Sequence, residues 1–175
     1  MELETPTLIS ALRLGGLDRD ELADAMRPLW EDAGPLVDRL LGRSASSWDD
    51  HLAMARSAIA SMDDPTRAEL LRAHPPIGAA PSVLARCSVL SYREQGGAAD
   101  RQPDCAATLA TLNRRYETRF GFPFVEWVAG RPLETIIAVL EARLGGDRSN
   151  ELAAGCSALV SIAQDRLSHL RTVHP

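Results

Sequence analysis

Two polar clusters near the middle of the chain contain the residue types that proton chemistry needs. His74-Pro75-Pro76-Ile77-Gly78 places an imidazole where a predicted helix must end and follows it with a stiff turn. Ser91-Tyr92-Arg93-Glu94-Gln95 lies further along the chain and supplies a carboxylate. An imidazole that titrates near neutral pH, next to a carboxylate, can move protons without a cofactor. The two clusters therefore predict a candidate acid–base site.

Both residues also have a structural interpretation. A histidine at a helix C-terminus is stabilised by the helix dipole, whatever its function. Ser91-x-x-Glu94 has the spacing of a capping box, but the preceding residues already look helical and Gly96-Gly97 follows. A helix that began at Ser91 would have almost no length, so the cap explains Glu94 poorly. His74 keeps both interpretations.

Arg166 lies in the last predicted helix and borders its apolar face. Leu159, Ala163 and Leu170 mark that face by their helical spacing. Snorkelling or an ion pair within the chain would explain the position of the guanidinium. A contact with a substrate carboxylate is the sharper alternative.

An aromatic segment, Phe120-Gly121-Phe122-Pro123-Phe124-Val125, joins two predicted helices and is followed by Glu126 and Trp127. Gly and Pro between aromatic residues make a stiff connection whose backbone amides can point at a ligand. We expect the rings to pack in the core first and to line a pocket second.

The elements that must position these residues are all predicted to be helices. Helix-forming residues dominate, β-branched and aromatic residues are sparse, and no segment shows strand alternation. We expect one all-α domain over residues 1–175, a helical bundle of about seven or eight helices. The expected ranges are Asp18 to Trp30, Pro35 to Leu41, Ser46 or Ser47 to Met62, Asp64 to His74, Ser82 to Gln95, Pro103 to Arg119, Pro132 to Leu144, and Asp147 or Ser149 to Leu170.

Composition excludes several classes of function. All 19 basic residues are Arg, so a lysine Schiff base, a pyridoxal-phosphate anchor and a P-loop lysine are excluded. The net charge of -5 and the interleaving of Arg with Asp and Glu argue against nucleic acid and anionic membranes as partners.

Cysteine and histidine spacing indicates neither a disulfide framework nor a metal site. Cys87, Cys105 and Cys156 are widely separated, and the four His residues form no cluster with metal-ligand spacing. Without a signal peptide or a long apolar run, we expect a cytoplasmic protein with reduced thiols and no metal.

Four motifs occur in one order along the chain. They are His74-Pro75-x-Ile77-Gly78, Ser91-x-x-Glu94-Gln95, Leu112-Asn113-x-x-Tyr116-x-x-x-Phe120-Gly121-Phe122-Pro123-Phe124, and Arg143…Glu151…Arg166-Leu167. This order resembles the 2-oxo-4-hydroxy-4-carboxy-5-ureidoimidazoline (OHCU) decarboxylase family, whose enzymes complete the breakdown of urate to (S)-allantoin. The resemblance covers roughly residues 64 to 171.

The resemblance implies an all-helical, cofactor-free and usually homodimeric enzyme acting on a small anionic heterocycle. His74 matches the family's catalytic acid–base histidine, and Glu94 matches the carboxylate that works with it. The residues that match its substrate contacts are Pro75, Ser91, Gln95, the backbone of Val125, Glu126, Trp127, Val128 and Ala129, and, near the site, Arg166.

The chain departs from the family pattern at a few positions. Pro76 stands where an acidic or basic residue is frequent, and Ala129 stands where a basic residue often precedes the glycine. Glu126 would add a negative charge near an anionic substrate. Two alternatives therefore stay open: a relative that acts on another carboxylated heterocycle, and a non-catalytic helical binding or dimerisation module.

Overall fold

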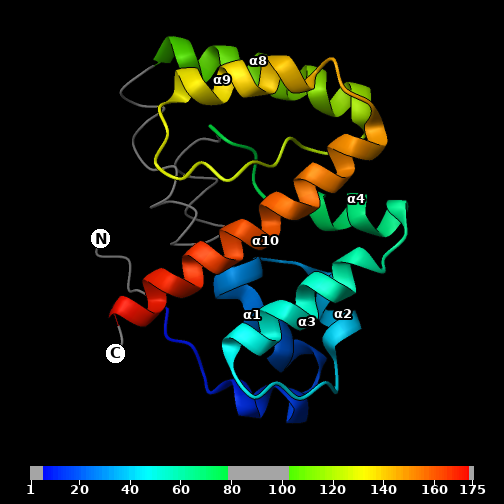
Figure 1. Cartoon of the computed structure of the whole chain (residues 1–175), viewed down its shortest axis with the longest axis vertical. Coiled ribbons are helices and arrows are strands. Elements are labelled where there is room, and N and C mark those ends of the chain that lie inside the picture. The colour runs from blue at the N-terminus through cyan, green and yellow to red at the C-terminus, as the bar shows by residue number, and fades with distance from the viewer. Residues whose placement is uncertain (1–5, 79–102, 174–175) are drawn as a thin grey trace.

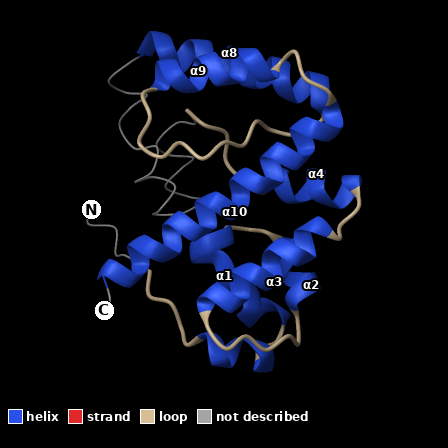
Figure 2. Cartoon of the chain, in the orientation of Figure 1, coloured by secondary structure: helices blue, strands red, loops and turns tan. Residues whose placement is uncertain are grey.

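The chain is built from helices, as its sequence predicts. The structure is a computed structural model that describes residues 6–78 and 103–173. Within these ranges there is no β-strand (Figure 2). The helices are the 3-10 helix η1 (Ala11–Gly16) and the α-helices α1 (Arg19–Trp30), α2 (Gly34–Leu40), α3 (Trp48–Ala60), α4 (Asp64–Arg72), α8 (Pro103–Phe120), α9 (Leu133–Arg143) and α10 (Arg148–Val173). The all-α prediction is confirmed, and the helix predicted from Ser82 to Gln95 lies outside the described residues.

Polar side chains cap the helices where the sequence predicts their starts. The carboxylate of Asp18 accepts from the backbone N–H of Glu21, and the Glu21 carboxylate accepts in return from Asp18 N–H, which completes a capping box. Ser47 caps α3, and Asp147 accepts from the first backbone N–H groups of α10. Local capping therefore sets these helix starts.

The long helix α10 holds the two ends of the molecule together. It runs diagonally across the molecule and packs against α1, α3 and α4 (Figure 1). A Cβ atom added at Gly155 would lie 2.8 Å from Cδ1 of the buried Leu71, so glycine lets α10 approach α4 closely. Helices α8 and α9 pair side by side at one end, and α1 to α3 pack together at the other (Figure 1).

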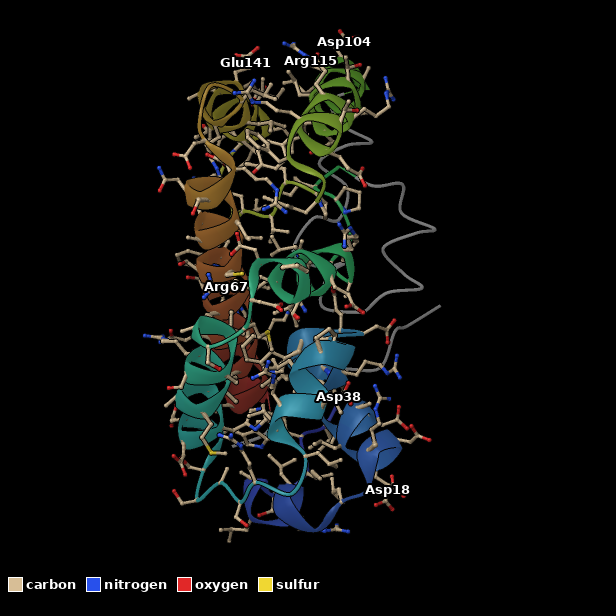
Figure 3. All side chains as sticks on the ribbon, turned by 90° about the vertical axis from the view of Figure 1, so that its right-hand side faces the viewer. Asp18, Asp38, Arg67, Asp104, Arg115 and Glu141 are labelled. Atoms are coloured by element: carbon tan, nitrogen blue, oxygen red, sulfur yellow. The ribbon has the colours of Figure 1, made fainter. Side chains whose placement is uncertain are left out.

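Charged side chains cover the outside of this arrangement. Asp104, Arg115 and Glu141 are exposed and project from the end formed by α8 and α9 (Figure 3). Among the described residues, no helix is long and apolar enough to cross a membrane. The same part of the chain brings no three potential metal ligands together.

Candidate functional site

The turn after α4 places His74 inside the protein. Helix α4 ends at Arg72 because the residue before a proline avoids helical geometry, and the His74 N–H still bonds to Leu71 O at 3.1 Å. His74 and Pro75 are buried, whereas Pro76 is exposed. The imidazole is therefore held inside the protein, and its neighbour Pro76 projects to the surface.

Asn113 of α8 fixes the far side of this turn. Its side-chain amide donates to the carbonyl oxygen of Ile77 at 2.9 Å. Gly78 follows with a φ of 79°, in the left-handed region that favours glycine. The turn is thus anchored to α4 at one end and to α8 at the other.

Among the residues that the structure describes, the charged partner of His74 is Glu31, at the end of α1. The Nδ1 atom of His74 lies 2.9 Å from Oε2 of Glu31, and both side chains are almost completely buried. The other carboxylate oxygen, Oε1, accepts from Nη2 of Arg166 at 3.0 Å. One carboxylate therefore bridges the imidazole and the guanidinium. We call Glu31, His74 and Arg166 the buried triad.

Arg166 is held from two sides. Its side chain is 1% exposed, and its Nη1 donates to the carbonyl oxygen of Leu29 at 3.2 Å while Nη2 binds Glu31. The ion pair offered as the ordinary explanation of Arg166 is present. The predicted contact between Arg166 and substrate stays a prediction.

Sequence reasoning missed Glu31. Glu31 and Asp32 directly follow α1, where the helix dipole disfavours negative charge. Asp32 is exposed and bonds to Arg27, but Glu31 is 4% exposed. An acidic residue at the C-terminal end of a helix, where its charge is unfavourable, was the one feature of the sequence that could have indicated a special role for Glu31. Its partners could not be read from it, because they lie far away in the sequence.

The segment between α8 and α9 lies next to the His74 turn. Arg72, at the end of α4, donates to the carbonyl oxygen of Gly121 at 2.7 Å. Phe122 and Phe124 are fully buried, and their rings meet Tyr116 edge-on. The aromatic residues therefore pack in the core, as the sequence predicts first, and the backbone of this segment approaches the turn after α4 (Figure 1).

Two arginines neutralise Glu126 in the same segment. Its carboxylate accepts from Nη2 of Arg131 at 2.7 Å and from Nη1 of Arg143 at 3.0 Å. Arg131 also bonds to the carbonyl oxygens of Trp127 and Val128, so it ties the segment to itself. The negative charge expected from Glu126 is therefore compensated locally.

Arg143 joins this segment to α8 and α10. Its Nε donates to Oε2 of Glu151 at 2.6 Å, and the Tyr116 hydroxyl donates to the same oxygen at 2.6 Å. Burial and the hydrogen bond to Glu151 raise the pKa of Tyr116 well above its usual value, so its hydroxyl stays protonated. We call Tyr116, Glu126, Arg131, Arg143 and Glu151 the arginine network.

Comparison with known proteins identifies the family. The model of the OHCU decarboxylase family matches residues 16–168. The chain belongs to this family. Its members are carboxy-lyases of urate degradation. The resemblance that the sequence motifs indicate is therefore confirmed at the level of the family.

Individual relatives support the assignment. The chain is 29% identical over 167 residues to the 2-oxo-4-hydroxy-4-carboxy-5-ureidoimidazoline decarboxylase of Halalkalicoccus jeotgali, a match that covers 94% of this chain and 93% of that protein. It is 28% identical over 162 residues to the uric acid degradation bifunctional protein PucL of Bacillus subtilis. That match covers 91% of this chain but only 32% of the larger protein.

Solved structures share the fold. A crystal structure of OHCU decarboxylase in the presence of (S)-allantoin aligns with a TM-score of 0.65 and 21% identity, covering 80% of this chain and 92% of the other. A crystal structure of (S)-allantoin synthase aligns with a TM-score of 0.64 and 18% identity, covering 93% of this chain and 54% of the other. At these identities the likeness concerns the fold alone.

The structure brings only part of the predicted site together. His74 and Arg166 share the carboxylate of Glu31, and Pro75, which follows His74 in the chain, is also buried. Ser91, Glu94 and Gln95 lie outside the described residues. The remaining predicted contacts form one segment, in which Val125 is buried, Glu126 and Val128 are half-buried, and Trp127 and Ala129 are exposed.

Proposed function

We propose that this protein decarboxylates OHCU to (S)-allantoin, with His74 as the acid–base group paired with Glu94. The observation that carries the proposal is the placement of His74 in a chain of this family. Its side chain is 6% exposed and lies against a carboxylate that Arg166 holds on the other side. A histidine kept only for the helix dipole needs no such partners.

The reaction suits a single positioned proton donor. When the bond to the carboxylate breaks and carbon dioxide leaves, its electron pair forms a double bond to the neighbouring ring carbon, and the imine nitrogen on that carbon takes up the displaced pair and a proton. The hydroxyl on the first carbon then loses its proton and becomes a carbonyl, while the pair of the new double bond takes a proton at the former imine carbon. An acid on one side of the ring must add that proton to one face. We assign that proton to His74 and the contact with the substrate hydroxyl to Glu94.

The segment from Val125 to Ala129 supplies backbone to the site in this proposal. Ala129 and Gly130 both have positive φ, 51° and 70°, which turns the chain sharply before α9. The Glu126 side chain is engaged by Arg131 and Arg143, so we assign substrate contact to the backbone here. Backbone amides in a fixed segment can stabilise charge that develops during the reaction.

The deciding assay follows optical activity. OHCU is generated in situ from urate, and the circular dichroism of (S)-allantoin is recorded with and without the protein. We expect rapid appearance of the S enantiomer and a loss of about 10²- to 10⁴-fold in rate for His74→Ala and for Glu94→Ala. His169→Gln, an exposed histidine on α10, is the matched control and should keep the wild-type rate.

The alternatives give different results in this assay. If folded wild-type protein does not accelerate the reaction, OHCU is not the substrate. Turnover of another carboxylated heterocycle that still requires His74 would then identify a relative with a different substrate. Binding of such compounds without turnover would identify a non-catalytic module.

The same proposal includes a homodimer of single-domain chains, in the cytoplasm, that needs no cofactor. Light scattering on the purified protein measures the dimer directly. Full activity after dialysis against a metal chelator is expected, and activity that returns only on addition of a metal would contradict the cofactor-free mechanism.

A further inference from the structure

Glu31 occupies a position that is unfavourable in three ways. Its φ of 57° and ψ of −139° fall in a region that side chains with a Cβ atom rarely adopt. Such a conformation is strained and persists only where the surroundings impose it. Its carboxylate is also buried, and it lies at the negative end of the α1 dipole.

The partners of Glu31 compensate for this position. Arg166 supplies a buried positive charge to Oε1, and His74 presents Nδ1 to Oε2. A buried carboxylate of this kind is strongly destabilising without its partners. Since Arg166 alone would balance the charge, the contact with His74 needs a separate explanation.

The chemistry of imidazole explains the contact between His74 and Glu31. An ionised carboxylate only accepts hydrogen bonds, so a hydrogen bond across the 2.9 Å between Nδ1 of His74 and Oε2 of Glu31 requires the proton on Nδ1. In a neutral imidazole the other nitrogen, Nε2, is then the basic one. Arg166 donates to the second oxygen and so restricts rotation of the carboxylate. The Glu31 carboxylate therefore fixes both the orientation of the His74 ring and its tautomer.

We propose that Glu31 is a positioning residue for His74: held by Arg166, its carboxylate keeps the proton on Nδ1 and leaves Nε2 to exchange the proton with substrate. The inference rests on the proposed function for its effect on rate. Its effect on the tautomer of His74 does not depend on what the substrate is. Arg166, on this view, acts on His74 through Glu31.

The direct test is the tautomer of His74 by nuclear magnetic resonance. In the intact chain with ¹⁵N-labelled histidine at alkaline pH, long-range ¹H–¹⁵N correlations report which ring nitrogen is protonated. The His74 signals are those missing from His74→Gln. We expect the Nδ1–H tautomer in wild type. An Nε2–H tautomer in wild type would overturn the proposal, whatever the activity.

Glu31→Gln should reverse the tautomer. Arginine offers only donors, so the amide oxygen of the glutamine turns to Arg166 and the amide N–H₂ faces His74. Nδ1 must then accept, and the proton moves to Nε2. The matched control is Asp32→Asn, the adjacent exposed carboxylate, which should leave the tautomer unchanged. An Nδ1–H tautomer in a folded Glu31→Gln protein would contradict the inference.

Kinetics separate positioning from general stability. With OHCU as substrate, we expect kcat of Glu31→Gln to fall by about 10²- to 10⁴-fold, with little change in KM. Glu31→Asp keeps a carboxylate and should recover much of that loss. Equal losses in the two variants, or a loss confined to KM, would count against positioning. If wild type does not turn over OHCU, the proposed function fails, while the wild-type tautomer still decides the role of Glu31.

Discussion

At the scale of single residues, the structure changes the meaning of Glu126. In sequence this residue adds a negative charge where an anionic substrate is expected. In the structure two guanidinium groups bind its carboxylate, and the two arginines and two carboxylates of the arginine network balance in formal charge. Glu126 is therefore compatible with an anionic substrate, and it fixes the segment that leads into α9.

We expect Glu126→Ala to loosen this segment. Arg131 would lose its carboxylate partner while Arg143 keeps Glu151, so the free energy of unfolding should fall by about 1–3 kcal/mol. KM for the substrate should rise. Urea unfolding and steady-state kinetics measure the two effects, with Glu141→Ala on the exposed side of α9 as control. A lower KM with unchanged stability would show instead that Glu126 repels the substrate.

At the scale of elements, the His74 turn depends on the helices at its two ends. His74 lies just after the end of helix α4, and α8 holds the turn through Asn113. A turn tied to two packed helices can keep an imidazole in one place, whereas a loop anchored at one end cannot. Asn113 belongs to the family motif, and its bond to Ile77 gives that match a physical reason.

Asn113→Leu tests this support. The variant removes the donor to Ile77 O while keeping a side chain of similar size, so we expect a loss of about 1–2 kcal/mol in unfolding free energy. We also expect a lower kcat, because the turn that carries His74 gains freedom. Thr111→Val, on the same helix, serves as the control: it removes a hydroxyl that donates to Ala107 O and accepts from Arg114, both within α8. Equal kinetics in both variants would show that the turn does not need Asn113.

At the scale of the whole molecule, a second buried histidine links stability to pH. His51 lies inside α3, is 2% exposed and packs edge-on against Trp48. Burial lowers its pKa to about 4, although the nearby Asp50 acts in the opposite direction. His51 is therefore neutral in the folded protein at pH values where the unfolded chain binds a proton.

The sign of the effect follows from that difference. Between pH 6.5 and about 4 the unfolded state binds more protons, so the folded state should lose stability as the pH falls, by up to about 3 kcal/mol. Above pH 6.5 His51 should not contribute to the pH dependence of the free energy of unfolding. Urea unfolding across this range should show a smaller slope for His51→Leu and an unchanged one for His169→Gln. An unchanged slope in His51→Leu would assign the effect to other groups.

Much of the architecture is readable from the chain because it follows local rules. Asp18 with Glu21, Ser47 and Asp147 cap helices through neighbours three residues away or fewer. Pro75 ends α4, and the spacing of apolar residues selects the buried faces. His74 stands out for the same reason, since its helix end and its proline turn are both local features.

Only the tertiary structure decides which charges meet. Glu31, His74 and Arg166 come from the end of α1, the turn after α4 and the C-terminal half of α10, and the sequence holds no periodicity that would pair them. Their pairing depends on how α10 packs across α1 and α4. Capping and helix spacing act over a few residues, so the chain itself determines its helices and marks His74. A buried charge needs a partner of opposite charge, which can lie anywhere in the sequence. Only the fold therefore decides that Glu31 meets His74 and Arg166.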